Sequence, residues 1–121
     1  MDKKALIQAY KETPRPMGVY CVRNTVNGRS LVGSSRDLPS ILNRERTTLR
    51  FGAHRNVPLQ NDWNQLGADA FVFEVLDTLT PPDDAPNYDP REDLVVLETL
   101  WIERLSPYVE GGYMKRARER N

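Results

Sequence analysis

The chain has 121 residues, of which 39% are hydrophobic and 28% charged, and its 17 basic residues are balanced by 17 acidic ones. This composition is typical of one globular domain and excludes a disordered or fibrous chain. One cysteine, Cys21, and one histidine, His54, exclude an internal disulfide and a cysteine-rich zinc site. No apolar run reaches the roughly 20 residues of a membrane span, and a signal peptide is not indicated. We therefore expect a cytoplasmic protein without a membrane partner.

The charges are segregated along the chain. Five arginines gather in the middle, at Arg36, Arg44, Arg46, Arg50 and Arg55, and Lys115 and Arg116 begin a basic tail, whereas residues 77 to 103 hold eight acidic side chains. This segregation is compatible with one positive face that binds phosphates, and equally with solvated helix faces whose charges happen to cluster. The zero net charge argues only against indiscriminate binding to nucleic acid.

The first elements form a short helix and a hairpin. Residues 2–11 are compatible with a helix that ends before Pro14. Residues 17–23 and 29–33 are rich in strand formers, and Asn27-Gly28 between them is typical of a tight hairpin turn.

Two helices follow. Asp37 is a suitable N-cap for a helix with Leu38, Ile41, Leu42 and Leu49 on one stripe, which we expect to end at Gly52. Asn56 is the expected N-cap of a second helix, which contains Trp63 and ends at Gly67.

The last third of the chain predicts a strand, a loop and a long helix. Residues 71–76 have the pattern of a third strand, and residues 80–90 form an acidic loop rich in proline. The run Asp89-Pro90-Arg91-Glu92 predicts a capping box with Pro90 at the first helical position. Apolar residues at helical spacing continue to Ser106. We expect both Trp63 and Trp101 to lie in the core. The order of elements predicts an α+β fold: a short, mainly antiparallel sheet of about three strands with flanking helices.

Two glycine-containing tripeptides carry the most specific signal. Gly18-Val19-Tyr20 and Leu31-Val32-Gly33 place Tyr20 and Leu31 eleven positions apart, and Gly52-Ala53-His54, residues 97–102 and Gly112-Tyr113 follow in order. This pattern resembles the GIY-YIG nuclease family over residues 17–114. The resemblance implies a small α+β sandwich at 17–114, with an N-terminal helical extension at 1–16 and a basic tail at 115–121.

The resemblance also implies roles for individual residues. Glu98 would hold Mg²⁺ or Mn²⁺, Tyr20 would activate the attacking water, and His54 would contact the phosphate or assist proton transfer. The remaining cations would bind nucleic acid, DNA in preference to RNA: Arg36, Arg46, Arg50, Arg55, Lys115 and Arg116. Structural alternatives stay open, because Glu98 could be a solvated acid, Tyr20 a core aromatic and His54 a structural loop residue.

Several polar positions of the family pattern are changed. Leu31 replaces the second tyrosine, Ile41 falls on the catalytic arginine, and Met114 falls on a late asparagine. Arg44 lies one helical turn beyond Ile41 and is the candidate replacement, although a plain surface arginine is an equal alternative. Glu45 stands where the family often has histidine or tyrosine, and its carboxylate would either help to hold the metal or repel phosphate.

The resemblance therefore implies a metal-dependent endonuclease that hydrolyses phosphodiester bonds in DNA, with repair as one setting for such chemistry. Two alternatives remain: a catalytically impaired module on the same fold that binds nucleic acid or a protein partner, and a fold used for interaction without nucleic acid. The physiological substrate, the pathway and the oligomeric state do not follow from the sequence.

Overall fold

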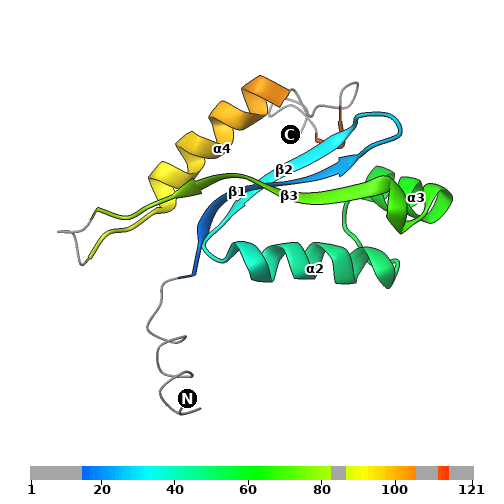
Figure 1. Cartoon of the computed structure of the whole chain (residues 1–121), viewed down its shortest axis with the longest axis horizontal. Coiled ribbons are helices and arrows are strands. Elements are labelled where there is room, and N and C mark those ends of the chain that lie inside the picture. Colours follow the sequence, from blue (N-terminus) through cyan, green and yellow to red (C-terminus); the bar gives the residue numbers. More distant parts are fainter. Residues whose placement is uncertain (1–14, 83–86, 106–111, 115–121) are drawn as a thin grey trace, which may run out of the picture.

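A computed structural model describes residues 15–82, 87–105 and 112–114. Three strands form one antiparallel sheet in the order β2-β1-β3 (Figure 1). The elements in chain order are β1 (Met17–Asn24), β2 (Ser30–Ser35), α2 (Leu38–Arg50), α3 (Val57–Leu66), the 3₁₀ turn η1 (Ala68–Ala70), β3 (Phe71–Leu79) and α4 (Arg91–Leu105). The predicted α+β class and the small antiparallel sheet are confirmed.

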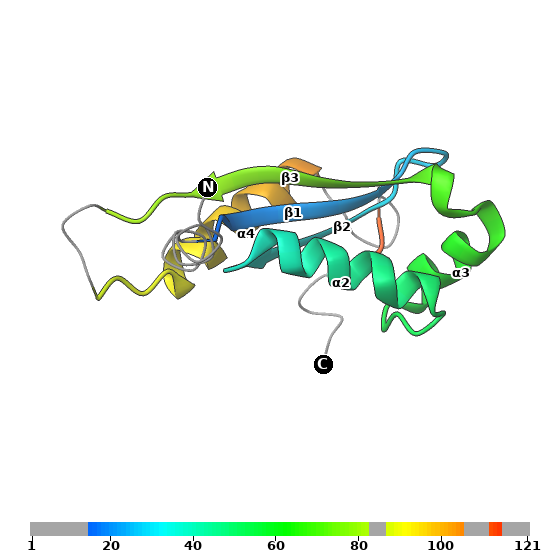
Figure 2. The ribbon, with the colours of Figure 1, turned by 60° about the horizontal axis from the view of Figure 1, so that its bottom comes forward.

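The helices cover both faces of the sheet, so the molecule has three layers. Figures 1 and 2 show α2 and α3 on one side of the strands and α4 on the other. Strand β1 is central, and five consecutive residues of β1, from Gly18 to Val22, are buried. A strand buried on both faces loses the polar alternation of a half-exposed strand, which explains the continuous apolar run from Val19 to Val22.

Each layer has its own hydrophobic cluster. The buried residues between the sheet and α2 and α3 are Val22, Leu49, Leu59, Trp63, Phe71 and Tyr113. Those under α4 are Val19, Cys21 and Val32, against which Leu97, Trp101 and Ile102 pack. Burial raises the pKa of the Cys21 thiol to about 12, so the single cysteine is an inert core residue. Both tryptophans contribute to these clusters as expected.

The predicted N-caps of helices α2 and α3 are both present. The Asp37 carboxylate accepts a hydrogen bond from the backbone N–H of Ser40 at 3.2 Å, and the Asn56 side-chain oxygen accepts one from Leu59 at 3.1 Å. Helix α4 begins at Arg91, one residue later than predicted, because the Pro90 carbonyl accepts the first helical bond, from Leu94, at 2.8 Å. Pro90 therefore precedes the helix and is not its first residue.

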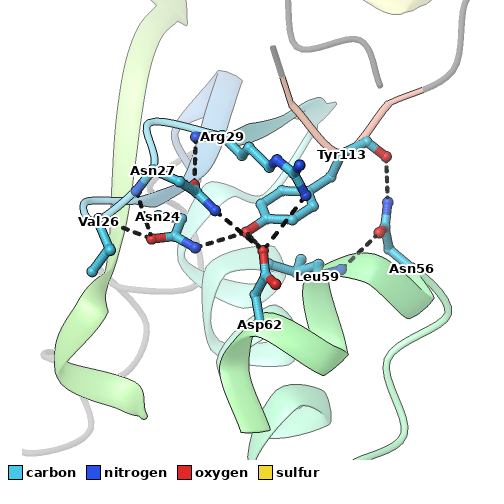
Figure 3. A network of polar contacts seen from close by, with 8 residues as sticks. All are labelled: Asn24, Val26, Asn27, Arg29, Asn56, Leu59, Asp62 and Tyr113. Carbon is cyan, nitrogen blue, oxygen red and sulfur yellow. Dashed lines mark hydrogen bonds and ion pairs between the residues drawn. The ribbon is translucent and has the colours of Figure 1, made fainter. Parts of the chain in front are cut away.

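A buried polar network ties the hairpin and α3 to residues 112–114 (Figure 3). Asn24 is fully buried and donates from Nδ2 to the Tyr113 hydroxyl at 3.0 Å. The Tyr113 hydroxyl in turn donates to Asp62 of α3 at 2.7 Å, and the Asn56 amide donates to the Tyr113 carbonyl at 2.8 Å. Because both ends of Tyr113 are held, α3 and the loop before it have a fixed position against the sheet.

Several predictions lie outside the described residues: the helix at 2–11, most of the acidic loop centre, the end of the last helix beyond Leu105, and the basic tail with Lys115 and Arg116. In the described ranges, no helix is long and apolar enough to cross a membrane.

Candidate active site

The phenol of Tyr20 lies across the edge strand of the sheet. Tyr20 pairs with Gly33 in the β1–β2 register, and its side chain is 8% exposed. A Cβ on Gly33 would lie 2.6 Å from the Tyr20 hydroxyl oxygen and 2.7 Å from Cζ. Only a glycine at position 33 lets the ring lie flat over β2, so the last residue of the second tripeptide positions the tyrosine of the first.

The glycine of the first tripeptide has a similar steric reason. A Cβ on Gly18 would lie 2.0 Å from the carbonyl oxygen of Asp77 on β3. The β1–β3 register shifts between Val19 and Tyr20, immediately after this close approach. The irregularity re-aims the strand where Tyr20 leaves it, as bulges next to sites commonly do.

Charged groups from both helical layers converge on Tyr20. Burial, and then the carboxylates of Glu45 on α2 and Glu98 on α4, raise the pKa of the Tyr20 phenol well above its usual range, whereas Arg55 and Arg44 act to lower it. The raising effects win, so the phenol stays protonated at neutral pH. Glu98 and Arg44, two other predicted site residues, are thus among the charged groups that act on the Tyr20 phenol.

His54 is held by the protein on both ring nitrogens. Nδ1 accepts a hydrogen bond from the backbone N–H of Asn56 at 3.0 Å, which leaves the proton on Nε2. Nε2 then donates to the Glu45 carboxylate at 2.5 Å, in a pair whose side chains are 9% and 14% exposed. With both nitrogens engaged, the ring orients Glu45, and its predicted role toward phosphate stays a prediction.

The loop before α3 is fixed by one buried amide. Gln60 on α3 is 6% exposed; it accepts from the His54 backbone N–H at 3.0 Å and donates to the Leu49 carbonyl at 3.0 Å. The side chain thereby closes the end of α2 onto the start of α3. Gln60 is not among the predicted site residues, because nothing in the local sequence pattern separates it from a surface glutamine.

A pocket of about 190 Å³ lies beside this pair of acid and histidine. Its lining combines two arginines, the Glu45–His54 pair and two small residues: Arg44, Glu45, Thr48, Ala53, His54 and Arg55. The pocket therefore offers two arginine side chains near a carboxylate. The arginines suit an anionic ligand, because their guanidinium groups partly offset its negative charge.

Leu31 and Ile41 are part of the packing at this site. Leu31 is half-buried and packs against the cluster under α2 and α3, and Ile41 on α2 is also half-buried. The hydroxyl and guanidinium of the family pattern are thus replaced by apolar contacts. Arg44, exposed on the same helix, brings a guanidinium to the pocket from a neighbouring turn.

The predicted DNA-binding arginines are divided between different surfaces. Arg44 and Arg46 are two residues apart on α2, so their side chains point about 200° apart around the helix. Arg44 lines the pocket, whereas the Arg46 guanidinium lies 4.7 Å over the Phe73 ring of β3. Arg36 bonds to Asp89 at 3.0 Å. Helix geometry thus separates cations that the sequence groups together.

The donor set fits a hard cation with few protein ligands. Two carboxylates, Glu45 and Glu98, both raise the pKa of the Tyr20 phenol. Carboxylate oxygens are ligands that suit Mg²⁺ or Mn²⁺, and these ions keep most of their bound waters. Among the described residues, no cluster of three or more His, Cys, Asp or Glu side chains could hold a metal ion. Glu98 would therefore be supplemented by water and substrate phosphate.

The chain is similar to known proteins in sequence and in structure. No family model matches the chain. The chain is 28% identical over 95 residues to intron-associated endonuclease 1 of Enterobacteria phage T4, an alignment that covers 78% of this chain and 35% of that protein. It therefore spans about a third of the length of that relative.

The solved structures give the same relationship. The catalytic domain of homing endonuclease I-TevI superimposes with a TM-score of 0.64 at 26% identity, over 80% of this chain and 95% of that domain. A mutant of the catalytic domain of intron endonuclease I-TevI gives a TM-score of 0.66 at 25% identity, over 82% and 92%.

The described residues thus form three antiparallel strands and three α-helices, the fold of the I-TevI catalytic domain. By sequence and by structure, the chain is similar to the I-TevI catalytic domain, in keeping with its resemblance to the GIY-YIG nuclease family.

Proposed function

We propose that this protein is a DNA endonuclease that depends on a divalent metal, with Glu98 as the metal ligand and Tyr20 beside the attacking water. The observation that carries the proposal is a pocket lined by Arg44, Glu45, His54 and Arg55, with Glu45, Glu98 and Arg44 acting electrostatically on the Tyr20 phenol, in a fold similar to an endonuclease catalytic domain. These residues come from different elements, so their arrangement is a property of the tertiary structure.

Each side chain has a physical task in this proposal. The neutral Tyr20 hydroxyl is a hydrogen-bond donor and acceptor that orients water near the scissile phosphate. Arg44 and Arg55 line the pocket and offset the negative charge of the phosphate. A bound Mg²⁺ or Mn²⁺ would supply a water of lowered pKa and cancel part of the carboxylate charge beside Tyr20.

Glu45 and His54 have a joint role in the proposal. The hydrogen bond from Nε2 engages one oxygen of the Glu45 carboxylate, and His54 keeps that carboxylate in one orientation. A ligand whose orientation is fixed by a second residue is typical of metal and phosphate sites. In this proposal Glu45 assists Glu98 in holding the metal, which is one of the two roles that its position suggested.

The test is a cleavage assay on single-stranded DNA, duplex DNA and RNA with Mg²⁺, with Mn²⁺ and with chelator. We expect cleavage of DNA that chelation and Glu98→Gln both abolish. Arg44→Ala should reduce cleavage by about a hundredfold or more, the loss typical of removing one group that stabilises transition-state charge. Arg46→Ala is the matched control, because Arg46 lies on the opposite flank of α2.

Two results would contradict the mechanism: cleavage that survives chelation, or cleavage by Glu98→Gln at the wild-type rate. A specific observation favours an alternative function, since Leu31 and Ile41 replace two polar groups with apolar contacts. DNA binding without cleavage under any of these conditions would establish that alternative, a catalytically impaired binding module.

A further inference from the structure

Phe51 is the most exposed large apolar side chain among the described residues, at 81%. It follows the last residue of α2, and its ring takes no part in either hydrophobic cluster. The phenylalanines on β3 behave differently: Phe71 is buried against Trp63, and Phe73 is covered by Arg46. The exposed benzyl group forgoes the favourable free energy of burial, and its ring face is free to pack against a ligand.

The backbone that carries Phe51 is held firmly. The N–H of Phe51 bonds to the Thr47 carbonyl at 3.1 Å, and the N–H of Ala53 bonds to the Thr48 carbonyl at 3.0 Å. Gly52 between them has a φ of 72°, the left-handed conformation that closes a helix. Gln60 then fixes the same turn to α3. The ring is thus presented on a preorganised turn, which lowers the entropy lost on binding.

Exposed arginines flank Phe51 along the chain. Arg50 precedes it and Arg55 follows four residues later, and both are exposed. The same turn contributes Ala53, His54 and Arg55 to the pocket beside the candidate active site. An aromatic ring next to arginines is the combination that binds a base by stacking while cations hold the adjacent phosphates.

We propose that Phe51 stacks on an unstacked base of the DNA substrate, next to the phosphate held in the pocket. The inference rests on the proposed function and specifies its substrate class. Bases in a regular duplex are stacked on both faces, so an exposed ring finds a free face only where a base is unpaired or a step is opened. The substrate is therefore single-stranded or locally distorted DNA.

The experiment measures equilibrium binding by fluorescence anisotropy, with chelator present so that no DNA is cut. The probes are a short duplex with one unpaired base, the same duplex with an abasic site at that position, and the fully paired duplex. The full-length wild type is compared with Phe51→Ala, Phe51→Trp and the control Val26→Ala. Val26 is also apolar and exposed, at 67%, but lies in the β1–β2 hairpin.

We expect the wild type to bind the unpaired-base duplex most tightly. Phe51→Ala should weaken that binding by about tenfold, a typical loss for one base stacked on an aromatic ring, and should leave the abasic duplex unaffected. Phe51→Trp should retain the preference, and Val26→Ala should match the wild type. Thermal unfolding of all four proteins should be nearly the same, because both side chains are exposed.

Equal binding by Phe51→Ala and wild type on all three probes would overturn this inference and would direct attention to a protein partner for Phe51. That result leaves the proposed nuclease function intact if the wild type still cleaves DNA. Absence of wild-type binding to every probe, together with absence of cleavage, would overturn both proposals.

Discussion

Replacing Gly33 with alanine tests whether the position of the Tyr20 phenol controls activity. The added methyl would lie 2.6 Å from the phenol oxygen, 2.7 Å from Cζ and 2.8 Å from Cε1. Carbon atoms prefer separations of about 3.5–4.0 Å, so the ring must move by about 1 Å. We expect Gly33→Ala to lower the free energy of unfolding by about 1–3 kcal/mol, the usual cost of an overpacked site.

The effect on cleavage should exceed the effect on folding. A displacement of about 1 Å in a reacting group can cost about a hundredfold in rate, so we expect a loss of that order at a temperature where the variant is folded. Cleavage is measured under single-turnover conditions, and folding is measured separately by urea unfolding. Comparison of the two separates a misplaced phenol from an unfolded protein.

A double-mutant cycle with Tyr20→Phe provides the control. Tyr20→Phe removes the hydroxyl, so a further Gly33→Ala change should have little additional effect on cleavage if both act through that group. Wild-type cleavage by Gly33→Ala would refute the reasoning. The same would follow if Gly33→Ala reduced cleavage as strongly in the Tyr20→Phe background as it does alone.

Three further predictions concern stability. His54→Ala leaves the Glu45 carboxylate without its hydrogen-bond donor and should lower the free energy of unfolding in urea by about 1–3 kcal/mol. The loss should be smaller when Glu45→Gln is already present, and strictly additive losses would argue against the pair. Asn24→Ala breaks the buried network and should cost a similar amount, about 1–3 kcal/mol, whereas exposed Asn27→Ala should cost far less; equal losses would contradict this assignment. Burial and the hydrogen bond to an aspartate raise the pKa of Tyr113 to about 12, so stability from this group is constant below the unfolded pKa of about 10 and is lost as pH rises toward 12. Tyr113→Phe should therefore reduce the fall in stability over that pH range, and an unchanged slope would show that other groups cause it.

The local elements could be predicted from the sequence because their determinants are local. The Asn27-Gly28 turn, the Asp37 and Asn56 caps and the apolar run of β1 each act within a few residues. The two tripeptides also indicated the fold, and the steric reason is now visible, since Gly18 and Gly33 permit close approaches that any Cβ would block.

The properties of the candidate site were decided by the tertiary structure. The Glu45–His54 pair joins residues from α2 and the following loop, and no local pattern predicts that the histidine faces a carboxylate. The pKa of Tyr20 depends on burial and on carboxylates from α2 and α4, which together raise it more than the nearby arginines lower it.

The arginine distribution shows the same limit of sequence reasoning. The sequence groups Arg44 with Arg46, but the helical rotation of about 100° per residue turns one toward the pocket and the other over Phe73. Phe51 is an apolar residue of the kind usually found in a core, but its ring lies in solvent at the turn that Gly52 closes. The sequence by itself determined which elements form and which family they resemble. The packing of those elements decided which charges act together, because electrostatic and stacking interactions depend on distances between residues far apart in the chain.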